Sequence, residues 1–244
     1  RFGVKSGCDA FFMPHDVTQK LLEEYPNDMA WSKVPMIHGC HRRDVKSGKL
    51  KIIRAGDGSL LVGERTNVIG SRLFKNLVAE EKWEEATEIG RRQVKGGAHI
   101  VDVCRQSTER DEKKDIPFFY EKLIRKVKAP IMIDTTDPTA VELALTYCQG
   151  KAIINSINLE DGEEKFEKVV PIAHDFGAAI VVGCIDEDPK QAQAFTRERK
   201  LAIAKRSYEL LTKKYGMAPE DIVFDPLVFP CATGDENYIG GAVE

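Results

Sequence analysis

Short apolar runs alternate with longer amphipathic segments from about residue 60 to residue 229. The runs are apolar at consecutive positions, which is typical of strands buried on both faces. We expect six strands, over residues 60–64, 98–104, 130–134, 152–158, 178–186 and 221–229. Between them, apolar residues at helical spacing predict helices over 66–97, 117–127, 138–150, 164–177 and 197–216. Strands separated by helices in this way predict a parallel α/β fold.

The stretch from Lys128 to Glu160 shows this plan most clearly. Its first strand leads to Asp137, a good helix cap, and to Pro138, which the first turn of a helix accepts. Gly150 is expected to end that helix before the next strand begins. The two strands carry Asp134 and Asn155 at their ends, where parallel sheets and barrels place their chemistry.

Polar residues lie at or near the carboxyl ends of the predicted strands. The set consists of Glu64, Asp102, Asp134, Asn155, Asp186 and Asp225. A doubly wound sheet gathers its ligand groups near one switch point, whereas a barrel gathers them from many strands, so the pattern favours a (βα)8 TIM barrel. Such a barrel takes ~250 residues, and about 185 follow Leu60. We therefore expect a barrel domain over residues 60–244 that is truncated after its sixth strand.

Residues 1–59 differ from the rest of the chain. They mix short apolar runs with three prolines and a basic patch, and we interpret them as a linker or upstream segment. A hairpin about residues 55–59 is expected to lead into the first barrel strand. Because the chain begins at Arg1 rather than methionine, we expect it to be part of something longer.

Composition narrows the class of protein. Hydrophobic residues make up 42% and charged residues 31%, and the formal net charge of -3 gives no reason to expect nucleic-acid or membrane-surface binding. The six cysteines are scattered, which fits a reducing, cytoplasmic setting better than a disulfide framework. His38, Cys40 and His41 lie close together, but the usual zinc spacings are absent, so a surface turn is favoured over a metal site.

The candidate chemistry lies in carboxylates and amides rather than in a nucleophile. No P-loop, dinucleotide fingerprint or H-E-x-x-H motif is present. A carboxylate can accept two parallel hydrogen bonds from an N–C–N edge, and an asparagine can both donate and accept. A pterin presents such an edge through its 2-amino group and N3. Each of these side chains could instead cap a helix, but as a set they favour a binding site.

The sequence resembles a known family. GERTNVIGSRLFK, IMIDTT, IINSINLEDG, TRERK and PEDIVFDPLVFPCATGDE are similar to segments of the folate-binding (pterin-binding) barrels of cobalamin-dependent methionine synthases, over residues 60–244. The resemblance implies that the pterin is held by Asp134, Asn155 and Asp225. It also implies contributions from Glu64, Asn67, Asp102 and Arg197, with Arg199 shaping the rim beside Arg197. The family often has Asp-x-Asn on the second strand, where this chain has Asp102, Val103 and Cys104.

The resemblance implies methyl transfer from N5 of 5-methyltetrahydrofolate to cob(I)alamin in methionine synthesis from homocysteine. The cobalamin is expected on another domain or protein, zinc only in a separate homocysteine domain, and no metal in this barrel. Three alternatives stay open: a methyltetrahydrofolate:corrinoid iron–sulfur protein methyltransferase, a dihydropteroate synthase-like enzyme, and a pterin-binding fragment without catalysis. Dihydropteroate synthesis would need a phosphate-binding loop, which residues 106–110 match only faintly.

Overall fold

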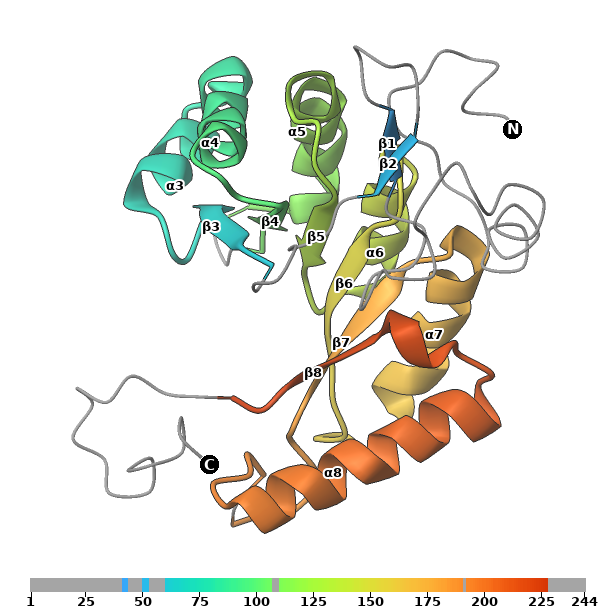
Figure 1. Cartoon of the computed structure of the whole chain (residues 1–244). Helices are drawn as coiled ribbons and strands as arrows, with labels where there is room; N and C mark the ends of the chain where they lie inside the picture. The colour runs from blue at the N-terminus through green and yellow to red at the C-terminus, as the bar shows by residue number, and fades with distance from the viewer. Residues whose placement is uncertain (1–40, 44–49, 53–59, 107–109, 191, 228–244) are drawn as a thin grey trace.

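The computed structural model describes residues 41–43, 50–52, 60–106, 110–190 and 192–227. Their main body is a six-stranded parallel sheet in which each strand pairs with the next in sequence. The strands are β3 (Val62–Asn67), β4 (Ile100–Cys104), β5 (Ile131–Asp134), β6 (Ile153–Ile157), β7 (Ala179–Gly183) and β8 (Ile222–Asp225). In Figure 1 the colour accordingly runs from teal through yellow to red along the sheet. The predicted α/β fold, with six strands of a barrel, is confirmed.

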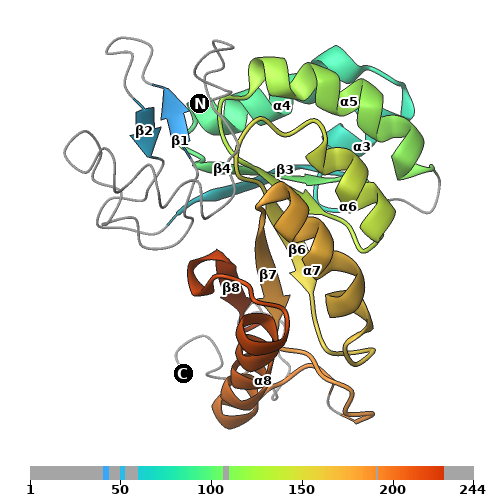
Figure 2. The ribbon, with the colours of Figure 1, turned by 90° about the vertical axis from the view of Figure 1, so that its right-hand side faces the viewer.

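Helices connect the strands and cover the convex side of the curved sheet, as Figure 2 shows for α4 to α7. Their bounds are α3 (Arg72–Ala79), α4 (Trp83–Lys95), α5 (Glu112–Lys126), α6 (Pro138–Leu145), α7 (Glu164–Phe176) and α8 (Arg197–Glu209). A π-helical turn, Leu210–Lys214, extends α8, and a 3-10 turn, Pro219–Asp221, precedes β8. No helix in these described ranges is long and apolar enough to cross a membrane.

Side-chain caps fix where several helices begin. Asp137 accepts a hydrogen bond from the backbone N–H of Thr139 at 2.8 Å, as the sequence predicted for α6. Ser71, Asp111 and Thr196 cap α3, α5 and α8 in the same way. Each cap satisfies a backbone donor that has no partner inside its helix. The starting points of the helices on the carboxyl-end side of the sheet are therefore set locally by sequence.

Three sequence-based expectations about elements are wrong. The helix expected over 66–97 is two helices, because Glu81 adopts a left-handed φ of 55° between α3 and α4. The helix α6 ends at Leu145 instead of Gly150, since the amides of Tyr147 and Cys148 bond three residues back and tighten the chain. Strand β2 (Leu50–Ile52) pairs antiparallel with β1 (His41–Arg43) rather than forming a hairpin with β3.

Most of the 1–59 segment, including His38 and Cys40, lies outside the described residues.

Apolar side chains form a layer on each face of the sheet. The larger layer lies between the sheet and the helices and includes the fully buried Phe74, Phe119, Tyr120 and Phe166. The smaller layer comprises Ile100, Ile153, Ala179 and Val181, with Met132 and Val223 packed against it. Side chains alternate between faces along a strand. The smaller layer therefore identifies the face of the sheet that, in a barrel, is the interior.

Candidate functional site

The polar residues predicted at the strand ends lie on the interior face, directly above the smaller apolar layer. Asp102, Asp134, Asn155 and Asp225 each follow a member of that layer or its packing partners by two positions, and so point to the same side. Asp134 is in register with Cys104 on β4 and Asn155 on β6. Parallel pairing thus aligns two of the predicted site residues, Asp134 and Asn155, along one edge of the sheet.

Asn67, the last residue of β3, connects the two central carboxylates. Its Nδ2 lies 3.3 Å from Oδ2 of Asp134 and 3.5 Å from Oδ2 of Asp102. Its Oδ1 accepts hydrogen bonds from the backbone N–H groups of Ile69 and Gly70, both at 2.8 Å. The amide of Asn67 therefore holds the β3–α3 loop with one end and the carboxylates with the other.

The surroundings of Asp102 and Asp134 disfavour the ionised form of both carboxyl groups. Burial, followed by the charge of Asp134, raises the pKa of Asp102 to about 7, although Asn67 and Asn155 lower it. Burial also raises the pKa of Asp134, which receives a hydrogen bond from the Cys104 thiol. Oδ1 of Asp102 is buried and has no hydrogen-bond partner of normal geometry in the described ranges. The site thus offers acceptors to a ligand that brings N–H donors.

Other predicted residues lie at the margin of this cluster. Glu64 is exposed on β3, and its charge raises the pKa values of Asp102 and Asp134. Asp225 uses Oδ1 to accept the Leu227 N–H at 2.8 Å, and its backbone carbonyl accepts the Cys184 N–H at 3.0 Å. Arg197 is exposed at the first position of α8, and among the described residues no contact joins it to the carboxylates.

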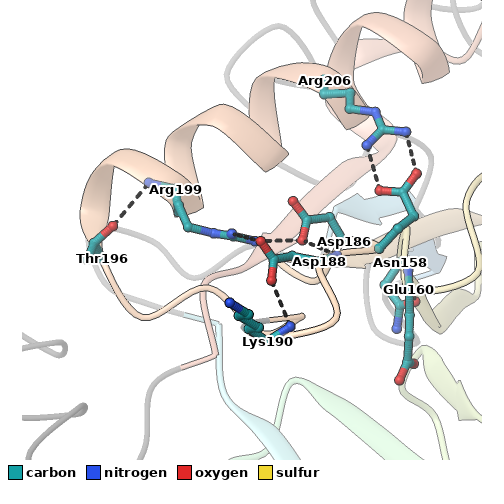
Figure 3. Close-up of polar contacts among 9 residues, drawn as sticks. Asn158, Glu160, Asp186, Asp188, Lys190, Thr196, Arg199 and Arg206 are labelled. Carbon is teal, nitrogen blue, oxygen red and sulfur yellow. Dashed lines mark hydrogen bonds and ion pairs between the residues drawn. The ribbon is translucent and has the colours of Figure 1, made fainter.

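Arg199 and Asp186 pair with each other at the β7–α8 loop. Arg199 donates to Asp186 at 2.6 Å and to Asp188 at 3.1 Å, drawing the β7–α8 loop against α8 (Figure 3). Arg206 makes two 2.7 Å bonds to Glu187 on the outer side of the same loop. Asp186, predicted to end a strand, lies beyond the end of β7, and its Oδ1 pairs with Arg199 in this loop.

The hydrogen bonds made by the two threonines after Asp134 were not predicted. The hydroxyl of Thr135 donates a hydrogen bond to Oε1 of Glu112 at 2.7 Å. The side-chain amide of Gln106 donates to the hydroxyl of Thr136 at 2.8 Å. The backbone N–H of Thr135 bonds to the carbonyl of Asn155 at 3.2 Å. These contacts join the segment that follows β5 to the segment that follows β4 and to β6 itself. The two threonines after Asp134 were the available sequence signal, but their partners are brought near only by the fold.

Comparison with known proteins identifies the family of the chain. The family model described as "Pterin binding enzyme" matches residues 63–240, which is more than half of the chain. Methionine synthase of Mycobacterium leprae (strain TN) is 35% identical over 188 residues, covering 76% of this chain. The chain spans only 15% of the length of that relative.

Solved structures with a similar fold include two dihydropteroate synthases. The enzyme from Vibrio fischeri ES114 is 18% identical, with a TM-score of 0.50 over 80% of this chain and 70% of its own. The enzyme from Xanthomonas albilineans, in complex with 7,8-dihydropteroate, is 16% identical, with a TM-score of 0.51 over 74% of this chain and 62% of its own. At this identity the likeness concerns the fold alone. The family match and the sequence relative together show that the chain belongs to the pterin-binding enzyme family.

Proposed function

We propose that this chain binds 5-methyltetrahydrofolate through its pterin ring and transfers the N5 methyl group to cob(I)alamin carried on another domain or protein. The observation that carries the proposal is the partly buried polar cluster of Asp102, Asp134 and Asn67 towards the carboxyl ends of adjacent strands. The 35% identity with a methionine synthase supports methyl transfer as the reaction. The same relative supports homocysteine as the final methyl acceptor of the whole protein.

The carboxylates and amides towards the carboxyl ends of the strands form a polar ring around the barrel mouth. In this proposal this polar ring orients the pterin. Asp134, Asn155 and Asp225 accept or donate hydrogen bonds along its N–C–N edge, while Asn67, Asp102 and Glu64 line the β3–β4 side. Arg197 lies at the β7–α8 rim, where a negatively charged folate tail would pass. Orientation of this kind lowers the barrier by holding the methyl group in line with its acceptor.

The methyl carbon leaves N5 as its bond to N5 breaks, and N5 needs a proton to become a good leaving group. Cob(I)alamin supplies the nucleophile when its domain docks. The site's own contribution is to hold a proton close to the pterin, and a carboxyl with a pKa of about 7 is half protonated at neutral pH. Asp102 is the group in this cluster with that property. In this proposal the zinc of the whole protein belongs to a separate homocysteine domain. Within the described residues no group of three or more His, Cys, Asp and Glu could hold a metal ion.

The first test is calorimetric titration of the chain with 5-methyltetrahydrofolate, followed by cob(I)alamin on the same sample. Binding and then the absorption spectrum of methylated cobalamin would support the proposal. Binding without methyl transfer would favour a pterin-binding fragment. Condensation of p-aminobenzoate with a pterin pyrophosphate by the chain would favour dihydropteroate synthesis instead.

Substitutions at the ring test the residue assignments. We expect Asp225→Asn and Asn155→Ala each to weaken folate binding by roughly tenfold to a hundredfold. Asp225→Asn loses a hydrogen bond to a charged group, which contributes about 1.5–3 kcal/mol, and Asn155→Ala leaves a polar atom of the ligand unsatisfied, which costs about 1–3 kcal/mol. Titration calorimetry measures the affinity, and circular dichroism checks the fold. Glu121→Gln is the matched control, since Glu121 pairs with Arg125 on the exposed face of α5. Unchanged affinity in both ring variants would overturn the assignment.

A further inference from the structure

Gly183, the last residue of β7, occupies an interior position at the level of the polar ring. Ala179 and Val181 of the same strand belong to the interior apolar layer, so Gly183, two positions further, faces the same side. It is in register with Asp225 on β8. On the other side, Ile157 of β6 pairs with Val182, so Asn158 lies next to Gly183, and Asn155 lies nearer the amino end of β6 on the same interior face. The ring of polar side chains therefore has an opening at β7.

Neither the backbone conformation of Gly183 nor its described neighbours require glycine at this position. The backbone of Gly183 does not have the positive φ that favours glycine elsewhere in the chain, as at Gly162 and Gly177. A Cβ on Gly183 would meet Cβ of Asn158 at 3.8 Å, and the Ile157 carbonyl and Ile185 Cδ1 at 4.0 Å, all ordinary van der Waals distances. Glycine weakens a strand interior relative to residues with a side chain. Backbone conformation and packing against these residues would thus both accept a Cβ.

The opening lies where a ligand would cross the sheet. A ring system that contacts side chains of both β6 and β8 must pass over β7, because neighbouring strands lie about 4.8 Å apart in the order β6, β7, β8. Val181 provides an apolar surface below the opening, and Asn158 lies beside it, held by Lys165 and the Glu160 N–H. A side chain at residue 183 would fill this path.

We propose that Gly183 is a specificity-determining residue that leaves room for a flat, two-ring heterocycle to lie between Asn155 and Asp225. The inference rests on the proposed function, since it takes the ligand to be a pterin. A planar ring fits over the bare backbone of β7, whereas any branched side chain there excludes it. Glycine at this position weakens β7 locally, and it leaves the polar ring accessible to the ligand.

Two graded variants of the full 244-residue chain test this. Gly183→Val is expected to weaken binding of 5-methyltetrahydrofolate and of a bare pterin at least tenfold, and Gly183→Ala about threefold. The melting temperature of both variants should be unchanged or higher, because a side chain in an extended strand restricts the unfolded chain. A variant that merely damages the structure would instead lose stability and affinity together.

Ala218→Val is the matched control, since Ala218 has an extended backbone before β8, at the opposite end of the sheet. It is expected to leave both affinities unchanged. Folded Gly183→Val protein that binds with unaltered affinity would overturn the inference, and if that variant does not fold, unaltered affinity of Gly183→Ala would do so. Absence of pterin binding by the unmodified chain would instead refute the proposed function on which the inference rests.

Discussion

At the scale of single residues, Asp102 shows how position on a strand becomes chemistry. Its carboxyl is 2% exposed and lies beside Asp134, with no basic side chain among the groups that shift its pKa. Proteins bury a carboxylate at a cost in stability unless it is paired. The residue that is placed to serve the ligand therefore destabilises the ligand-free fold at neutral pH.

This cost gives a prediction for stability against pH. The folded-state pKa of Asp102 is raised from 3.8 to about 7, so between these values the folded state binds more protons than the unfolded state. The free energy of unfolding then falls as pH rises through this window. Asp102→Asn removes this term and should be more stable than the unmodified chain at pH 8, on the order of 1–3 kcal/mol, with the difference vanishing near pH 4.

Urea unfolding of both proteins between pH 4 and pH 8 measures the effect. Residues such as Glu112, whose pKa is also raised by burial, are common to both proteins and cancel in the comparison. Parallel stability curves for the two proteins would show that Asp102 ionises normally in the folded state.

At the scale of elements, the β7–α8 loop depends on one arginine. Two backbone bonds, from Asp186 N–H to the Ala192 carbonyl at 2.9 Å and from Ala194 N–H to the Cys184 carbonyl at 3.1 Å, make it a small hairpin. Arg199 attaches this hairpin to α8 through Asp186 and Asp188 (Figure 3). Without the guanidinium, two partly buried carboxylates would lie side by side and repel each other.

We therefore expect Arg199→Ala to open the hairpin. Amide hydrogen exchange of Asp186 and Ala194, followed by NMR, should accelerate at least tenfold, because local opening exposes both donors. Arg206→Ala is the control, since its pair with Glu187 is nearly half exposed and such pairs contribute about 0–1 kcal/mol. Equal exchange in the two variants would show that Arg199 does not hold the loop.

At the scale of the whole molecule, a buried ion pair joins strands that are not neighbours. Lys151, just before β6, lies 2.6 Å from Asp221, just before β8, with side chains 4% and 8% exposed. The pair spans β7 at the amino-end side of the sheet, opposite the polar ring. It fixes the relative position of β6 and β8 on which the binding of one ligand by both strands depends.

Removal of one member of the Lys151–Asp221 ion pair should strongly destabilise the protein. Lys151→Met is expected to lower the free energy of unfolding by about 3–5 kcal/mol, because it leaves the charge of Asp221 buried without this cation. Chemical denaturation measures the loss, and the double variant Lys151→Met with Asp221→Leu should recover most of it. Lys168→Met, at an exposed pair with Glu164 on α7, should change stability little. A small loss in the Lys151 variant would show that the ion pair is dispensable.

The sequence by itself determined the number and order of the six barrel strands and that helices connect them, although it merged α3 with α4 and misplaced some element ends. Apolar runs and caps such as Asp137 act locally, so Asp134 and Asn155 could be placed at strand ends without a structure. A sequence pattern also shows charge and chemistry, but not which partner a flexible side chain finds. Arg197 and Arg199 therefore could not be told apart by their positions.

Only the tertiary structure decided those partners. Strand register brought Asn67 between Asp102 and Asp134, and packing joined Thr135 to Glu112 from 23 residues away. The opening at Gly183 likewise exists only because β7 lies between β6 and β8 with that residue turned to the interior. Long-range contacts of this kind depend on the three-dimensional arrangement of elements, since no local rule of spacing or propensity encodes them.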